Sequence, residues 1–147
     1  MKRIGQVATY PGRIGNLPTM LESVAPQFDE IHVVLNEFGK RQQRLLPRLP
    51  NVHYLLPEED LKDTGKFLRE ARADEYVFLL DDDLIFPPDY ADTLVAYLAR
   101  LPSSRVAVGV HGVVYSDLFE GAAPSRFVAK FDKALAKPTL VNQLGTG

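Results

Sequence analysis

Residues 76 to 83 read Tyr-Val-Phe-Leu-Leu-Asp-Asp-Asp, an apolar run that ends in three consecutive carboxylates. The apolar run from Tyr76 to Leu80 is typical of a strand that is buried on both faces of a parallel sheet. The aspartates follow at the carboxyl end of that strand, where open α/β sheets gather their ligands. The stretch therefore predicts a buried parallel strand that delivers an acidic cluster to a binding edge.

Adjacent carboxylates repel one another unless they meet solvent or a cation. Mg²⁺ and Mn²⁺ prefer oxygen ligands, and such an ion keeps coordination positions for phosphate oxygens. Side chains alternate along an extended chain, which predicts Asp81 and Asp83 together as cation ligands, with Asp82 on the other side. The alternative is a set of solvated turn and capping carboxylates before the next helix. Three in a row favour a metal-dependent nucleotide or diphosphate site.

Patterns of strand and helix alternate along most of the chain. We expect strands at 3–9, 30–35, 52–56, 76–80 and 105–110, and helices at 18–25, 40–46, 64–72 and 88–100. This alternation predicts the α/β class, with a mainly parallel, Rossmann-like sheet in a three-layer α/β/α arrangement. The remainder differs: a loop is expected at 112–124, and short strands of a different, antiparallel element at 127–131 and 138–144. The sequence thus predicts one domain over 1–147, with an alternating core over 1–110 and a distinct region over 111–147.

The bulk composition is that of one ordinary soluble domain. The chain has 147 residues, a net charge of −2 and no cysteine. The charge gives no general attraction to nucleic acid, and the lack of cysteine excludes disulfides, thiolate catalysis and cysteine-ligated zinc. No segment has the apolar length of a signal peptide core or a membrane span. We therefore expect a cytoplasmic location, with membrane association through another segment left open.

The loop from Thr9 to Arg13 follows the first predicted strand and opens at the same edge as the aspartates. Gly12 allows close approach of a ligand, Arg13 can pair with a phosphate, and Tyr10 can stack on a base. The alternative is a plain turn with a surface arginine. The spacing matches neither the dinucleotide-binding nor the Walker glycine pattern.

Three further residues are expected at this edge. Asn36 ends the second strand, where an amide could read a base. Lys66 stands near a predicted helix start, which favours an anion. His111 ends the predicted fifth strand and is a candidate contact for substrate or metal, although a single histidine is more often structural. Each alone is open to a structural role, and their convergence on one edge favours a site.

These residues resemble a known family. Ala-Thr-Tyr-Pro-Gly-Arg (8–13), Leu-Glu-Ser-Val-Ala-Pro-Gln (21–27) and Phe-Leu-Leu-Asp-Asp-Asp (78–83), with Pro-Pro-Asp-Tyr (87–90) after it, are similar to the nucleotide-binding half of GT-A glycosyltransferases, in particular the inverting family two. The segments at 65–67 and 110–112 also look like bacterial relatives that build surface polysaccharides. The resemblance spans nearly the whole chain.

The resemblance implies a role for each matching residue. Asp83 would bind Mn²⁺ or Mg²⁺ at the diphosphate, and Asp81 would lie beside the ribose or the metal. Asn36 stands where many relatives carry an aspartate that reads the base. The nucleotide pocket would be lined by Thr9, Tyr10, Pro11, Arg13, Asn36, Lys66, Asp81 and Asp82. The implied donor is a nucleotide-diphospho-sugar, most often a UDP-sugar, and the acceptor is a sugar or lipid-linked sugar.

The implied reaction is inverting transfer to an acceptor hydroxyl. In the family the catalytic base lies on a later helix, so the base and the acceptor half are expected beyond Gly147. Three other classes compete with this interpretation. A nucleotidyltransferase usually carries a basic, glycine-rich loop where only Arg13 stands here, and a receiver-like signalling domain needs an acidic pair where Thr9 and Tyr10 stand. An inactive nucleotide-sugar-binding module is the third.

Overall fold

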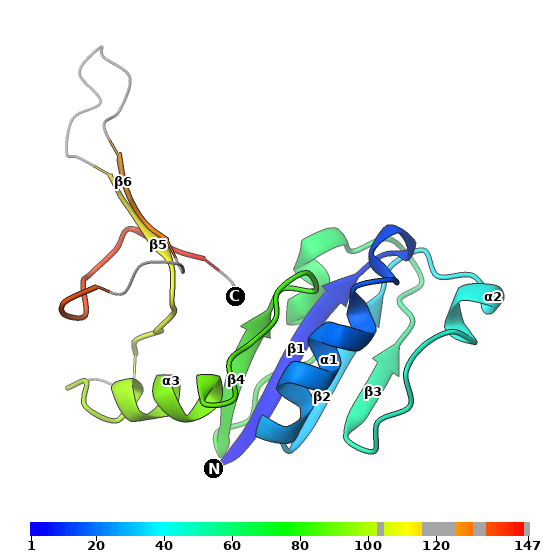
Figure 1. Ribbon diagram of the computed structural model, residues 1–147, viewed down its shortest axis with the longest axis horizontal. Helices are drawn as coiled ribbons and strands as arrows, with labels where there is room; N and C mark the ends of the chain where they lie inside the picture. The colour runs from blue at the N-terminus through cyan, green and yellow to red at the C-terminus, as the bar shows by residue number, and fades with distance from the viewer. Residues whose placement is uncertain (103–104, 116–125, 131–134, 146–147) are drawn as a thin grey trace. The chain divides into compact units, whose positions relative to one another are not determined.

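The computed structural model describes residues 1–102, 105–115, 126–130 and 135–145 (Figure 1). Its chain forms two compact units, Met1–Val95 and Ala96–Gly147. Among the described residues, no helix has both the length and the apolar character needed to cross a membrane. The first unit holds the acidic triplet and most of the predicted site.

A four-stranded sheet forms the centre of the first unit. Its strands are β1 (Lys2–Thr9), β2 (Glu30–Leu35), β3 (Val52–Leu55) and β4 (Glu75–Leu80). They lie in the order β3-β2-β1-β4, and every pairing is parallel. The predicted α/β class with a parallel sheet is therefore confirmed.

Apolar runs explain why these segments form strands. Ile4, Val7, Ile31, Val33 and Leu80 are fully buried, as expected where both faces of a parallel sheet are covered. The register sets Thr9 opposite Leu35 and Val7 opposite Leu80. The carboxyl ends of β1, β2 and β4 consequently meet at one edge.

Short helices connect the strands. They are η1 (Pro11–Arg13), α1 (Leu17–Val24), η2 (Ala25–Gln27), α2 (Lys40–Gln43), η3 (Lys62–Phe67) and α3 (Tyr90–Leu98). Helix α1 crosses in front of β1 and β2 in Figure 1, and it buries Leu17, Met20, Leu21 and Val24. Proline near its start suits the first turn, where the missing N–H costs nothing.

Helix η3 packs closely against β1 and β2. A Cβ atom at Gly65 would lie 3.0 Å from Cγ1 of Val34 and 3.3 Å from Cβ of Ala8. The helix predicted over 64–72 was wrong in type and extent, because this segment forms a 3₁₀ helix that begins at Lys62. Lys66 accordingly lies in its last turn, away from a helix amino end.

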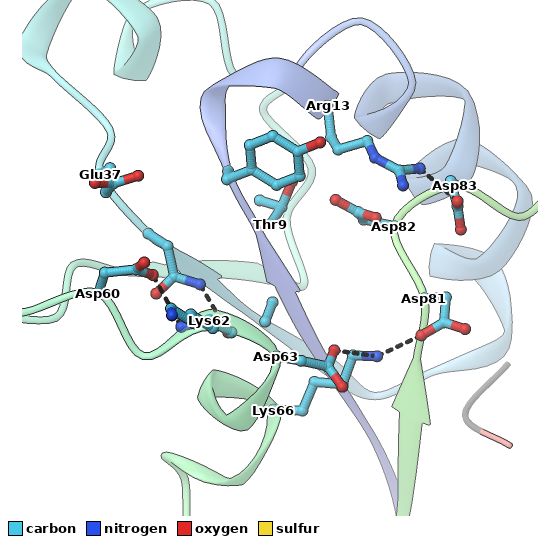
Figure 2. A pocket seen from close by; sticks show the side chains of 13 residues that line it. Thr9, Arg13, Glu37, Asp60, Lys62, Asp63, Lys66, Asp81, Asp82 and Asp83 are labelled. Atoms are coloured by element: carbon cyan, nitrogen blue, oxygen red, sulfur yellow. Dashed lines mark hydrogen bonds and ion pairs between the residues drawn. The ribbon is translucent and has the colours of Figure 1, made fainter.

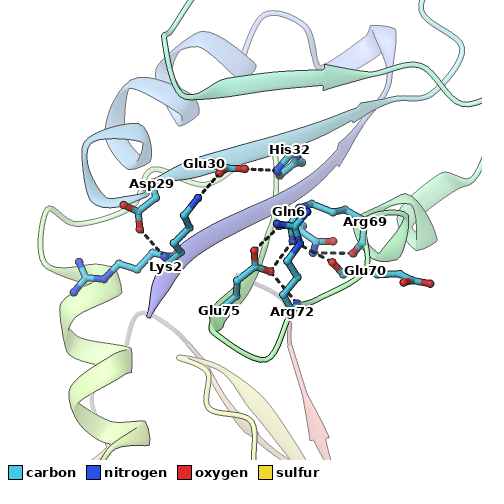
Figure 3. Close-up of polar contacts among 10 residues, drawn as sticks. Lys2, Gln6, Asp29, Glu30, His32, Arg69, Glu70, Arg72 and Glu75 are labelled. Atoms are coloured by element: carbon cyan, nitrogen blue, oxygen red, sulfur yellow. Dashed lines mark hydrogen bonds and ion pairs between the residues drawn. The ribbon is translucent and has the colours of Figure 1, made fainter.

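A buried ion pair fixes the segment after η3 (Figure 3). Nη2 and Nη1 of Arg69 donate to Oε1 and Oε2 of Glu75 at 2.6 and 2.9 Å. The Glu75 side chain is only 2% exposed, and Gln6 donates to the carbonyl of Arg69 at 3.1 Å. Hydrogen bonds from Arg69 lower the pKa of Glu75 to about 2. These contacts attach the segment that follows η3 to β1 and β4.

The second unit contains a separate sheet. Its strands β5 (Gly112–Tyr115), β6 (Arg126–Ala129) and β7 (Gln143–Leu144) lie in the antiparallel order β6-β5-β7. The predicted antiparallel element is confirmed, although its last strand is shorter than expected. Of the loop expected at 112–124, the first four residues form β5, and 116–124 lie outside the described residues.

The fifth parallel strand expected at 105–110 was wrong. These residues form no strand, and Val106 and Val110 are each 40% exposed. Their apolar pattern suits a strand, but a strand also needs a partner along its edge, and the described residues supply none here. The alternating pattern therefore ends with α3.

Candidate functional site

The topology of the sheet creates the candidate site. From β1 the chain proceeds outward through β2 and β3, and it then returns to the other side of β1 to form β4. The order of strands thus switches direction between β1 and β4. In open α/β sheets, ligands bind at such a switch point, beyond the carboxyl ends of the strands. Thr9 ends β1 and Asp81 follows β4, so both stand at this point.

A pocket of about 490 Å³ opens there (Figure 2). Four loops line it, one after each strand of the sheet. The lining residues are Ala8, Thr9, Tyr10, Arg13, Asn36, Glu37, Asp60, Lys62, Asp63, Lys66, Asp81, Asp82 and Asp83. Within the first unit, the structure thus brings together every predicted binding residue except Pro11. Pro11 is not among the lining residues, and His111 belongs to the second unit.

All of the acidic triplet faces this pocket. All three aspartates line the same cavity, and the division of roles between Asp82 and the pair Asp81 and Asp83 stays a prediction. Strand β4 ends at Leu80, and the chain turns at Asp82 and Asp83. Alternation between two sides applies only to extended chain, so the turn lets three successive carboxylates line one cavity.

Lys66 is a buried cation between two carboxylates. Its side chain is 3% exposed, its Nζ atom lies 2.9 Å from Oδ1 of Asp63, and it also donates to Oδ1 of Asp81. Burial alone would lower the pKa of Lys66, but the hydrogen bonds to Asp81 and Asp63 outweigh it and raise that pKa. The amine is therefore charged at neutral pH and held in place at the base of the carboxylate cluster.

A second ion pair joins Arg13 to Asp83 across the pocket. Nη1 of Arg13 donates to Oδ2 of Asp83, and both side chains are partly exposed, at 35% and 40%. The hydrogen bond to Asp83, followed by one to Tyr10, raises the pKa of Arg13. Figure 2 shows the guanidinium above the aspartates, where it reaches Asp83 from the β1 loop.

The hydroxyl of Thr9 is the one buried side-chain polar atom among the described residues with no hydrogen-bond partner. Thr9 is 2% exposed and lines the pocket. An unpaired buried hydroxyl destabilises a fold by about 1–3 kcal/mol, so its position requires an explanation. A ligand that hydrogen-bonds to it would supply one.

Asn36 holds the loop that carries the basic and acidic residues of η3. Its Nδ2 donates to the carbonyl of Lys62 at 2.8 Å, and its Oδ1 accepts from the N–H of Leu61 at 3.1 Å. Asn36 is 3% exposed. The amide is thus used inside the protein, and the expected contact with a base stays a prediction.

Two backbone outliers also border the pocket. Glu37 and Lys62 have φ values of 58° and 50°, in the left-handed region that L-residues seldom adopt. Both line the cavity. Such conformations cost about 1–3 kcal/mol, and they persist where the surroundings hold them, often at functional sites.

The lining is rich in oxygen ligands and negative in charge. It combines six carboxylates with three basic side chains. Yet among the described residues, no group of three or more acidic or histidine side chains is arranged to hold a metal ion alone. The donor set suits Mg²⁺ or Mn²⁺ held by one or two carboxylates together with phosphate oxygens, because these ions are often bound in that way.

Five lining residues were not predicted as site residues, and three of them, Asp60, Lys62 and Asp63, are close together in sequence after β3. Asp60 lies in the loop after β3, and Lys62 and Asp63 are the first residues of η3. Because β3 is parallel to its neighbours, the loop that follows it opens at the same edge, and the charged run at 58–63 could have been included on that ground.

Comparison with protein-family models finds no match to this chain, and comparison with curated proteins finds none either.

Proposed function

We propose that this protein binds a nucleoside diphosphate sugar together with Mg²⁺ or Mn²⁺, as the donor-binding part of a GT-A-type glycosyltransferase. One observation carries the proposal. The pocket at the switch point between β1 and β4 gathers Asp81, Asp82 and Asp83 with Arg13 and Thr9. The proposal includes the three-layer α/β/α arrangement of that class and a UDP-sugar as the donor.

The chemistry of a diphosphate fits the lining. A diphosphate is strongly anionic, and Arg13 offers a planar guanidinium that suits phosphate oxygens. The Thr9 hydroxyl can donate to a ligand oxygen, and the exposed ring of Tyr10 can stack on a base. The buried amine of Lys66 pairs with Asp63 and Asp81 and so reduces the repulsion among the carboxylates.

The excess of carboxylates explains why a cation belongs to the proposal. An anionic ligand alone would be repelled by the six acidic side chains around the pocket. Asp83, with Asp81 beside it, would hold the cation. When bound, the cation would neutralise the diphosphate and stabilise the charge that develops on it as a leaving group.

The proposed reaction is displacement at the anomeric carbon. An acceptor hydroxyl gives its proton to a general base and forms a bond to that carbon as the bond to the diphosphate breaks, with inversion, and the diphosphate leaves with the bonding electrons. The residues assigned here bind and orient the donor, and we assign no catalytic base. The acceptor would be a sugar or a lipid-linked sugar.

Calorimetry with and without MnCl₂ tests this proposal. We expect UDP to bind in the presence of Mn²⁺ and to bind far more weakly without it. Asp83→Ala should remove the dependence on Mn²⁺. Asp92→Ala is the matched control, because Asp92 also forms an exposed pair with an arginine, at 2.5 Å from Nη2 of Arg3. Failure of folded protein to bind any of UDP, GDP, ADP or CDP with Mn²⁺ would overturn the proposal.

The same titrations separate the competing classes. A nucleotidyltransferase would prefer a nucleoside triphosphate to UDP and to UDP-sugars. An inactive module would bind UDP-sugars with Mn²⁺ and release no UDP in the presence of any sugar acceptor. We expect the preference for the diphosphate, because three basic side chains among six carboxylates supply little positive charge for a triphosphate.

A further inference from the structure

The two ion pairs of the pocket differ in how easily they can break. Lys66 is buried, with its side chain 3% exposed, and its amine is shared between Asp63 and Asp81. Arg13 and Asp83 are 35% and 40% exposed and lie on loops that follow different strands. Partly exposed pairs contribute little net stability and exchange partners readily, whereas a buried amine does not leave its carboxylates without a large penalty.

The carboxylate of Asp83 has two competing uses. In this structure it accepts a hydrogen bond from Arg13. A divalent cation on the same carboxylate would lie within a few ångströms of the guanidinium, and like charges at that separation repel strongly in a partly enclosed site. The guanidinium and a cation therefore compete for Asp83.

Breaking the ion pair with Asp83 costs little free energy if Arg13 can pair with another anion nearby. The diphosphate of the proposed ligand would supply that anion at the same pocket, and a guanidinium pairs with phosphate as well as with carboxylate. We infer that Arg13 is an exchange residue, which pairs with Asp83 until a divalent cation takes that carboxylate and then pairs with the diphosphate. This inference rests on the proposed function.

The exchange has a thermodynamic consequence. The cation releases Arg13 for the phosphates, and the phosphates draw Arg13 from Asp83, so each ligand favours the other. By linkage, Mn²⁺ must raise the affinity for UDP by the same factor by which UDP raises the affinity for Mn²⁺. Part of that factor arises because Arg13 exchanges Asp83 for the diphosphate. Lys66 keeps its ion pair with Asp81 in both states.

Titration of Mn²⁺ alone tests the competition. Electron paramagnetic resonance counts free Mn²⁺ and suits weak binding. Arg13→Gln should bind Mn²⁺ roughly two- to fivefold more tightly than the wild type, which is the range expected from a partly exposed ion pair. Arg3→Gln is the matched control, because it removes the exposed pair with Asp92, and it should leave the Mn²⁺ affinity unchanged.

Titration of UDP without metal tests the other direction. Asp83→Asn frees Arg13, so this variant should bind UDP without Mn²⁺ roughly two- to fivefold more tightly than the wild type. Circular dichroism melts would check that each variant is folded. A simple loss of a binding residue would lower both affinities, whereas exchange raises them.

The outcomes separate the inference from the proposed function. If wild-type protein binds UDP with Mn²⁺ but neither variant gains affinity, the exchange by Arg13 is wrong and the proposed function stands. If wild-type protein binds no nucleoside diphosphate with Mn²⁺, the proposed function fails and the inference fails with it.

Discussion

Nδ2 of Asn36 donates a hydrogen bond of 2.8 Å to the carbonyl oxygen of Lys62, a residue with a φ of 50°. The bond joins the end of β2 to the start of η3, and Oδ1 of the same amide holds the N–H of Leu61. A buried side chain thus fixes a strained loop that brings Asp60, Lys62 and Asp63 to the pocket.

Replacement of Asn36 by alanine should loosen this loop. Two backbone groups in part-buried hydrogen bonds would lose their partners, so we expect the free energy of unfolding in urea to fall by about 1–3 kcal/mol. The amide of Leu61 should also exchange its hydrogen faster. Asn51→Ala is the control, because Asn51 bonds the carbonyls of Ala25 and Phe28, both at 2.9 Å, away from the pocket.

The two asparagine variants should differ in ligand binding. Both are expected to lose stability, but only Asn36→Ala should weaken the binding of UDP with Mn²⁺. Equal UDP affinities in the two folded variants would contradict the role of Asn36 in positioning the loop.

Thr9→Val should weaken the binding of UDP without lowering the stability of the fold. The substitution removes a buried hydroxyl that has no partner, so the free energy of unfolding should stay the same or rise by up to about 1–3 kcal/mol. The affinity for UDP with Mn²⁺ should fall, because the ligand loses a donor. Urea unfolding and calorimetry measure the two effects. A large loss of stability would mean that the hydroxyl already has a partner inside the fold.

Much of the fold could be predicted from the sequence, because a strand buried on both faces needs a continuous apolar run. Such runs marked β1, β2 and β4 closely. The run at 105–110 had the same character but forms no strand, since pairing depends on a partner that a local pattern does not contain. Register and pairing are long-range properties.

The site was predictable in part for a similar reason. The rule on strand ends placed Thr9, Arg13 and Asp81 correctly, because it depends only on parallel topology. The Asn36 amide forms hydrogen bonds with the backbone of Leu61 and Lys62, which lie 25 and 26 residues away in the sequence. These bonds depend on tertiary contact. No pattern within β2 could have predicted them.

Stability should fall in acid because of Glu75. Hydrogen bonds from Arg69 hold its pKa in the folded protein at about 2, below the ordinary value of 4.5, so the ionised form is favoured by folding. The resulting stabilisation is complete above about pH 5 and is lost as the pH falls toward 2. Glu75→Gln should lower the urea midpoint at pH 7 and flatten its dependence on pH below 5. The exposed Glu22→Gln should keep the wild-type profile, and a wild-type profile in Glu75→Gln would contradict this role.

Gly65→Ala should destabilise the first unit through overpacking. The new Cβ atom would lie 3.0 Å from Cγ1 of Val34, closer than ordinary contact, with Ala8 at 3.3 Å. We expect a loss of about 1–3 kcal/mol in urea unfolding. Gly15→Ala is the control, because no atom outside Gly15 and its two chain neighbours lies within 4 Å of its Cβ position. Similar losses in both variants would show that space near Val34 is not the cause.

Paramagnetic broadening of backbone amide signals tests the central claim most directly, because it locates the bound cation. Mn²⁺ is added to isotope-labelled protein that is saturated with UDP and Mg²⁺. We predict that the signals of Thr9, Asp82 and Asp83 broaden first, while those of His32 and Glu75 at the amino half of the sheet stay sharp. Broadening centred on His32 or Glu75, or none at the aspartates while UDP is bound, would contradict the site.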